Sequence, residues 1–283
     1  MALGTLKGLI KQGIMRRVPL GARKRLAVWI GAQQWLGTAR AAWWSAELVR
    51  DLADRDINEY HRFLWSNHLS YAAPYEVAVR FGEENMKGSR RLFFSDLKDH
   101  LAAIAVDPEL QIRSALEVGC SSGYQLRYME TAVFPAASEL SGIDIDAYAV
   151  DSGARYLAGI GSKVRLAAGD MLRFDQLTDG RRYDVIVCSG VLMYLEEASA
   201  ARLVESMLGR TAVMLACAGL AHPDRDNATL DHSVPRESDH TFIHNIDRMV
   251  ERAGGRVVAR RWEGGEHRDG HTIYFVFARR DSA

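Results

Sequence analysis

The 283-residue sequence contains little cysteine, little proline and no long apolar run. Its three cysteines, Cys120, Cys188 and Cys217, include no CxxC pair, which argues against a disulfide framework or a zinc site and favours a reducing compartment. There is no run of about 18 apolar residues that would form a spanning helix. The N-terminus also lacks the compact apolar stretch and cleavage site of a signal peptide. These absences predict a cytoplasmic protein without a metal site.

The sequence also lacks an excess of either charge sign. Its 36 basic residues balance 36 acidic ones, whereas a general nucleic-acid binder usually carries a basic excess, so no nucleic-acid partner is expected. The first 46 residues are the exception, because all eight of their charges are basic and the first acid is Glu47. Apolar residues interleave with these bases. Residues 1–46 therefore form a basic cap helix packed on its own domain, a peripheral contact with an anionic membrane, or a docking surface for a partner such as a second copy of the chain.

Residues 1–110 have a mostly helical pattern. Apolar positions recur at helical spacing from Trp43 to Leu64 and again from Leu92 to Ala105. The segment from Asn67 to Tyr75, which includes Pro74, interrupts this pattern. This region is predicted to be a helical N-terminal cap that contributes to substrate binding.

Residues 111–283 alternate short apolar runs with helical stretches, which is typical of a parallel sheet covered on both faces. The predicted strands are 115–118, 140–145, 164–167, 183–188, 212–217, 256–262 and 272–278. The predicted helices are 123–132, 148–157, 197–208 and 242–253. The sequence therefore predicts an α/β domain with a seven-stranded, mostly parallel sheet that ends in a hairpin.

A glycine-containing loop follows the first predicted strand, in the stretch Leu116 to Tyr124 (LEVGCSSGY). In open parallel sheets, ligands bind beyond the carboxyl ends of the strands. Gly119 allows a tight turn and a close approach of the ligand to the backbone, and Gly123 allows the next helix to begin close by. The loop alone is a weak signal.

Three later motifs strengthen the interpretation of this loop as a ligand site. An acid about 20 residues after a glycine loop is suited to the ribose diol, and Asp144 is favoured over Asp146 because it ends the apolar run. After the third strand, the Asp170 carboxylate can accept a hydrogen bond from an exocyclic amine while Met171 packs on a purine. After the fourth strand, the turn at Ser189 and Gly190 is small enough to face the ligand.

Taken in order, EVGCSSG, GIDID, AGDM and DVIVCSGVLMYL resemble the motifs of class I S-adenosylmethionine-dependent methyltransferases, over about residues 112–280. The resemblance implies a Rossmann-like sheet and S-adenosyl-L-methionine as the cofactor. Gly119 to Gly123 would hold its methionine part, Asp144 its ribose, and Asp170 with Met171 its adenine, while Glu117 would orient the loop. The implied cofactor-binding residues are Glu117, Gly119, Cys120, Ser121, Gly123, Asp144, Ile145, Gly169, Asp170, Met171, Ser189 and Gly190.

The methyl acceptor is narrowed by motifs that are missing. Methyltransferases that modify amino groups of nucleic acids typically carry Asn/Asp-Pro-Pro-aromatic after the fourth strand, where this chain has Cys188-Ser189-Gly190-Val191. Cytosine-C5 enzymes use a cysteine that follows a proline, and no cysteine here does so. Small molecules, sugars and lipids remain as acceptor classes.

Histidines gather in a long polar segment after the fifth strand, where long loops usually carry function. An alcohol acceptor must lose a proton, which suits a positioned His, Tyr or carboxylate. His222, His244 and Tyr194 are the candidate catalytic residues, and solvent-exposed loop histidines are the alternative. The candidate substrate-binding residues are His68, Tyr71, Tyr75 and His240.

These residues predict an O-methyltransferase acting on a hydroxyl of a sugar, glycan or glycolipid, with base-assisted in-line methyl transfer. A methyltransferase of a secondary metabolite or quinone precursor is the alternative enzyme. A cofactor-binding module without catalytic activity is a different class. A nicotinamide-dependent oxidoreductase is disfavoured, because it would carry GxGxxG rather than the spacing of Gly119 and Gly123.

Overall fold

The computed structural model describes residues 17–33, 38–70, 76–265 and 272–280. The chain forms two compact units, Met1–Tyr75 and Glu76–Ala283. The division at 75/76 differs from the expected boundary at residue 110. The reason is α7 (Ser89–Ala103), whose Phe93, Phe94, Leu97 and Leu101 are buried in the core of the second unit.

The first unit is helical, with α2 (Leu20–Gly31), α3 (Thr38–Leu48), α4 (Arg50–Ala53) and α5 (Ile57–Ser66). Its small core includes Ala27, Leu52 and Tyr60. Arg23 is buried on the inner side of α2, where it forms an ion pair with Asp51 and donates to the Leu48 carbonyl. Because a buried charge is costly unless it is paired, this ion pair explains why a basic residue is tolerated in the core.

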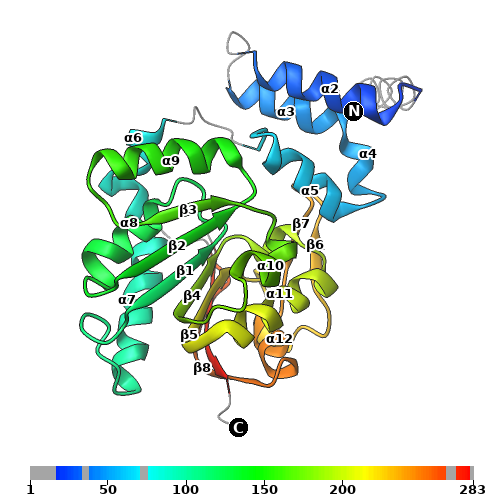
Figure 1. Cartoon of the computed structure of the whole chain (residues 1–283). Coiled ribbons are helices and arrows are strands. Elements are labelled where there is room, and N and C mark those ends of the chain that lie inside the picture. Colours follow the sequence, from blue (N-terminus) through cyan, green and yellow to red (C-terminus); the bar gives the residue numbers. More distant parts are fainter. Residues whose placement is uncertain (1–16, 34–37, 71–75, 266–271, 281–283) are drawn as a thin grey trace. The chain divides into compact units, whose positions relative to one another are not determined.

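The second unit is built on a seven-stranded sheet in the order β3-β2-β1-β4-β5-β9-β8. Figure 1 shows β3, β2, β1, β4 and β5 following one another in this order. The first five strands along the chain are parallel, and β9 runs antiparallel to both of its neighbours. The strands are β1 (Ser114–Val118), β2 (Glu139–Asp144), β3 (Arg165–Ala168), β4 (Tyr183–Ser189), β5 (Thr211–Gly219), β8 (Gly255–Glu263) and β9 (Ile273–Arg280). The predicted Rossmann-like sheet with a terminal hairpin is therefore confirmed.

Helices cover both faces of this sheet (Figure 1). One face packs against α7, α8 (Tyr124–Tyr128), the helical turn η3 (Met129–Val133) and α9 (Ala147–Gly159). The other packs against α11 (Glu197–Arg210) and α12 (Ile246–Arg252). The smaller helices are α6 (Val77–Arg80), η2 (Glu83–Met86), η4 (Met171–Arg173), α10 (Phe174–Thr178), η5 (Leu192–Tyr194) and η6 (Asn227–Thr229).

Strand residues alternate between the two cores. On β9, Phe275 and Phe277 join the α7 side, while Tyr274 and Val276 join the α11 side. Burial on both faces explains why the central strands β1, β4, β5 and β9 appear in the sequence as apolar runs rather than as alternating patterns. Burying a side chain such as Phe277 contributes about 1.5–3 kcal/mol relative to leaving it exposed.

Two features differ from the expected elements. The predicted helix 242–253 begins only at Ile246, because Thr241–Ile243 forms strand β7 and pairs with β6 (Val234–Arg236) in a separate hairpin. Asn245 sets the helix start, since its side chain accepts a hydrogen bond from the Arg248 N–H. Among the described residues, no helix is both long and apolar enough to cross a membrane.

Candidate functional site

The glycine loop after β1 makes a tight turn at the carboxyl edge of the sheet. Gly119 and Gly123 have φ of 77° and 80°, and Ser121 also lies in the left-handed region at 49°. The Gly119 and Cys120 N–H groups both donate to the Ile143 carbonyl on neighbouring β2, at 2.8 and 3.1 Å. These bonds fix the loop beside the end of β2, as a ligand site at the strand ends requires.

Asp144 joins two loops at the end of β2. One carboxylate oxygen accepts from the Ser121 N–H at 2.7 Å, and the other accepts from the Asp146 N–H at 2.9 Å. Burial raises the pKa of Asp144, although these backbone donors oppose the rise. Asp146, its competitor in the sequence, is itself buried and caps α9 by accepting from the Ala149 N–H. The ribose-binding role of Asp144 remains a prediction that this arrangement favours.

Buried polar atoms without partners gather behind the glycine loop. Among the described residues, Glu117 Oε2, Ser122 Oγ and Gln125 Oε1 are buried and form no hydrogen bond. Burial, followed by the nearby Asp144 charge, raises the pKa of Glu117 well above its usual range. Unpaired buried polar atoms cost free energy, so several of them around one loop indicate a site that a polar ligand completes. The loop therefore fits the amino-acid end of S-adenosylmethionine.

Two glycines outside the loop hold its shape. A Cβ at Gly153 in α9 would lie 2.2 Å from the Ser122 carbonyl oxygen, so only glycine lets α9 approach the loop backbone. A Cβ at Gly142 in β2 would lie 2.6 Å from the Cys120 sulfur, which packs over that strand. Cys120 is buried, and burial raises the pKa of its thiol well above its usual range, as expected for a packing residue rather than a nucleophile.

The remaining predicted cofactor residues lie at the ends of β2, β3 and β4. Ile145 is half-buried beside Asp144, and the Gly169 N–H donates to the Asp144 carbonyl at 2.8 Å. Asp170 caps η4 by accepting from the Leu172 N–H, with half-buried Met171 next to it. After β4, Ser189 is half-buried and Gly190 has φ of 69°. The fold thus brings all these residues to one edge of the sheet, while their individual contacts with a cofactor stay predictions.

The segment after β5 is organised around Asn227, which is fully buried. Its side-chain oxygen accepts from the His222 N–H and from the Trp262 indole, at 2.8 and 3.0 Å. Its amide nitrogen donates to the Leu220 and His244 carbonyls, at 2.9 and 2.8 Å. Four bonds from one side chain make this long polar segment a built structure rather than a loose loop.

His222 lies three residues beyond the end of β5 and is partly exposed. Its Nδ1 accepts from the Asp224 N–H at 3.2 Å, so the neutral ring carries its proton on Nε2. Within the described part of the chain, Nε2 forms no hydrogen bond. The ring can therefore offer a donor to a bound molecule, and it can act as a base only after the bond from Asp224 opens.

The geometry of His244 disagrees with the predicted role as a general base. Its ring is buried, Nε2 is 2.9 Å from the Leu192 carbonyl, and Nδ1 is 2.7 Å from Ser233 Oγ. Since a carbonyl only accepts, Nε2 must carry the proton and Nδ1 must accept from the serine hydroxyl. Burial lowers the pKa of His244. With both nitrogens engaged inside the protein, His244 joins η5 to the segment after β5 and has no atom left for a substrate.

Tyr194 ends η5 beside the β6–β7 hairpin. Burial, followed by the Asp239 charge, raises its pKa to about 12. At neutral pH its phenol therefore stays protonated and can donate a hydrogen bond but cannot remove a proton. This result narrows the predicted catalytic role of Tyr194 to orienting an acceptor.

The predicted substrate residues belong to both units of the chain. His240 lies in the turn between β6 and β7 with φ of 58°, and His68 follows α5 in the first unit with φ of 57°. Tyr71 and Tyr75 lie outside the described residues. No group of three or more His, Cys, Asp or Glu side chains within the described ranges is arranged to hold a metal ion.

Sequence reasoning missed two contributors to this edge of the sheet. Asn227 gave no signal, because a buried amide framework has no motif. Arg90 could have been noticed in the sequence, because the first turn of its helix contains two arginines and no acid. Acidic residues are usually favoured at that end of a helix. Arg90 lies with its guanidinium carbon 5.7 Å from the centre of the Tyr124 ring, directly after the glycine loop.

One family model matches part of the second unit. Residues 115–211 match the family model described as a methyltransferase domain, a range that begins in β1 and ends at the first residue of β5. No curated protein sequence matches the chain.

Solved structures share the fold at low sequence identity. The 1,6-didemethyltoxoflavin-N1-methyltransferase of Burkholderia thailandensis is 13% identical with a TM-score of 0.55, covering 79% of this chain and 90% of its own. The magnesium protoporphyrin IX methyltransferase of Synechocystis PCC 6803 is 12% identical with a TM-score of 0.51, covering 83% of this chain and 99% of its own. At such identities the likeness extends to the fold.

Proposed function

We propose that this chain, a class I S-adenosylmethionine-dependent methyltransferase, transfers a methyl group to a hydroxyl of a small-molecule acceptor, with a sugar or lipid-linked sugar as the favoured class. The bound cofactor supplies a sulfonium methyl group that is already activated. The protein's task is then to align donor and acceptor and to exclude water. The observation that carries the proposal is His222, whose Nε2 is available at the same strand-end edge as the glycine loop.

The roles of the residues follow from their contacts. The glycine loop and Asp144 would hold the cofactor's amino-acid and ribose ends, and Glu117 would support the loop from behind. His222 would bind the acceptor hydroxyl through Nε2. It would receive the hydroxyl proton at Nε2 in the tautomer that carries the ring proton on Nδ1, which requires the hydrogen bond from the Asp224 N–H to open. Tyr194, which remains a phenol at neutral pH, would orient the acceptor by donating a hydrogen bond.

An alternative acceptor is a ring system of a secondary metabolite or quinone precursor. The names of the two structural neighbours specify 1,6-didemethyltoxoflavin and magnesium protoporphyrin IX, which supports a small molecule over a macromolecule. A cofactor-binding module without activity is the alternative from another class. It would bind S-adenosylhomocysteine and transfer no methyl group to any acceptor.

The test is a screen of hydroxylated sugars, lipid-linked sugars and phenols with S-adenosylmethionine, in which mass spectrometry locates the added methyl group. We expect an O-methyl product. Replacing His222 by Gln should lower turnover about 100-fold or more, because a positioned acid-base group typically contributes that much. S-Adenosylhomocysteine affinity should stay unchanged. Methylation at nitrogen or carbon would contradict the hydroxyl acceptor, and unaltered turnover would exclude His222.

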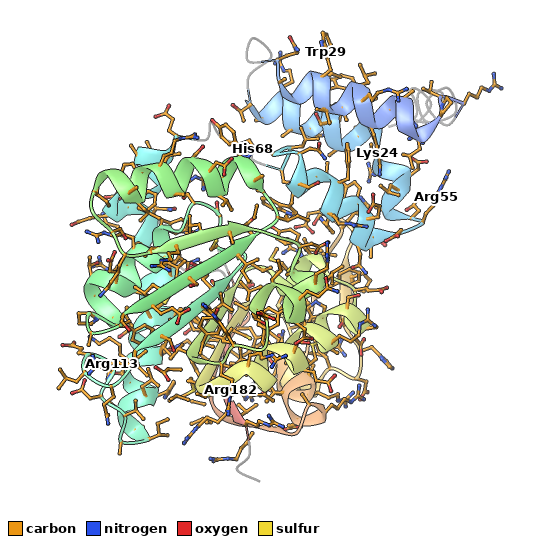
Figure 2. All side chains as sticks on the ribbon, viewed as in Figure 1. Lys24, Trp29, Arg55, His68, Arg113 and Arg182 are labelled. Atoms are coloured by element: carbon orange, nitrogen blue, oxygen red, sulfur yellow. The ribbon has the colours of Figure 1, made fainter. Side chains whose placement is uncertain are left out.

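We also propose that the first unit contacts an anionic membrane surface. Trp29 on α2 and Trp43 on α3 are 58% and 55% exposed, and Figure 2 shows Trp29 on the outer side of this helix pair. Exposed Arg25 and Arg40 accompany them, in a stretch of 46 residues that contains no acid. Tryptophan favours the membrane interface, and each nearby base adds about 1 kcal/mol of attraction to anionic lipid.

Sedimentation with lipid vesicles tests this contact. The protein should pellet with phosphatidylcholine vesicles that contain phosphatidylglycerol, and less with phosphatidylcholine alone. Replacing Trp29 and Trp43 by Ser should release it from the anionic vesicles. Failure of the wild-type protein to pellet with either vesicle would reject the membrane contact without affecting the methyltransferase assignment.

A further inference from the structure

Arg90 occupies an electrostatically unfavourable place. It lies in the first turn of the 15-residue helix α7, followed by Arg91, and this turn holds no acid. The amino end of a helix carries partial positive charge, which repels a cation. Among the described residues, no carboxylate forms an ion pair with Arg90, and its side chain donates to the Asn85 carbonyl at 3.1 Å.

The surroundings of Arg90 connect it to the glycine loop. Its guanidinium lies over the ring of Tyr124, the first residue of α8 and the neighbour of Gly123. Its charge is also close enough to Glu117 to lower the pKa of that carboxyl, although burial outweighs this effect. Half-buried Arg90 is thus a cation beside the glycine loop, around which three buried polar atoms are unpaired.

The chemistry of the cofactor explains why a cation is needed here. The amino-acid end of S-adenosylmethionine carries an ammonium and a carboxylate. Glu117 and Asp144, which flank the loop, suit the ammonium and disfavour the carboxylate. A carboxylate entering this region requires a cationic partner, and guanidinium is the side chain that matches a carboxylate with paired hydrogen bonds.

We propose that Arg90 binds the carboxylate of the cofactor's amino-acid end and so fixes the position of that end against the glycine loop. The inference rests on the proposed function, because it requires S-adenosylmethionine as the ligand. It explains the unfavourable location of Arg90, since a bound carboxylate would compensate both the arginine and the helix end. Arg90 is a cofactor-binding residue in this view and takes no part in proton transfer.

Calorimetry with two matched ligands tests the assignment. S-Adenosylhomocysteine and its decarboxylated analogue differ only in the carboxylate. The wild-type protein should bind the first about 10- to 100-fold more tightly, the range expected for a hydrogen-bonded charge pair. Replacing Arg90 by Gln should reduce S-adenosylhomocysteine affinity by a similar factor and leave the analogue's affinity unchanged. Arg90→Lys should recover part of the loss.

Arg91→Gln is the matched control, because Arg91 is exposed in the same helical turn and should preserve the wild-type ratio. An Arg90→Gln variant that weakens both ligands equally would show that Arg90 only supports the loop through Tyr124, and would overturn the proposal. The proposal would also be overturned if Arg90→Gln bound both ligands with wild-type affinity. If the wild-type protein bound neither ligand, the cofactor assignment itself would fail, which is a different result from a lost preference for the carboxylate.

Discussion

Buried polar side chains around the glycine loop and in the segment after β5 differ in whether their hydrogen bonds are satisfied within the protein. Around the glycine loop, Glu117, Ser122 and Gln125 each keep a buried polar atom without a partner. After β5, Asn227 and His244 use every available polar atom within the protein. Buried unpaired groups therefore mark where a ligand completes the fold, whereas saturated groups mark the framework. A histidine near an active site is a weak indication of catalysis until its ring nitrogens have been accounted for.

Replacing Asp144 by Ala should have the largest effect on the region around the glycine loop. Affinity for S-adenosylhomocysteine should fall about 10- to 100-fold in calorimetry, because the ribose loses a charged acceptor and the Ser121 N–H loses its partner. Asp146→Ala is the control. It should lower thermal stability by removing the cap of α9, while ligand affinity is retained. Equal losses of affinity would assign the ribose to both acids.

Gly153→Ala tests whether the loop depends on the close approach of α9. The added methyl would lie 2.2 Å from the Ser122 carbonyl oxygen, so the backbone must shift, and we expect a loss of about 1–3 kcal/mol in the free energy of unfolding. Gly159→Ala, in the same helix, meets nothing within 4 Å and should stabilise the protein by about 0.4–1 kcal/mol. Denaturant unfolding of both variants measures the difference. Similar free energies of unfolding for the two variants would show that the loop backbone shifts to accommodate the methyl group without loss of stability.

His244→Phe tests the framework role of the segment after β5. Loss of the bonds to Ser233 and Leu192 should lower the free energy of unfolding by about 1–3 kcal/mol, without changing ligand affinity. The pKa of His244 is lowered in the folded state, so the unfolded chain protonates first. Its contribution to wild-type stability should therefore shrink as pH falls below about 6.5, and the variant should lack this component. A bell-shaped activity profile that disappears in the variant would instead restore a catalytic role.

Tyr194→Phe should have the smallest effect. With a pKa of about 12, the phenol only donates a hydrogen bond, so its loss should cost about 0.5–1.5 kcal/mol in transition-state stabilisation. The pH dependence of turnover below pH 9 should be the same in both proteins. A large fall in turnover, together with a changed pH profile, would indicate that the site lowers this pKa when the acceptor binds.

The sequence was sufficient for the parallel sheet and for the residues at the ends of β1 to β4, because apolar runs and glycine motifs encode local backbone geometry. It was insufficient for the segment after β5. The apolar residues in Thr241–Ile243 are compatible with a helix or a strand. The segment forms a strand because it pairs with Val234–Arg236. The burial of His244 depends on Leu192, which is 52 residues away, and such long-range contacts leave no local pattern.

The buried cysteines give the protein its own reporters of opening. Cys188 on β4 and Cys217 on β5 are free thiols that lie opposite each other in the strand register, in the centre of the sheet. Cys120, also a free thiol, belongs to the glycine loop. All three thiols are shielded from solvent, so a thiol reagent can reach each one only when its surroundings open. Mass-resolved alkylation would then separate local opening of the loop, reported by Cys120, from opening of the sheet. A ligand that closes the loop would slow alkylation of Cys120 more than alkylation of Cys188 and Cys217. The ratio of these alkylation rates would therefore report cofactor binding.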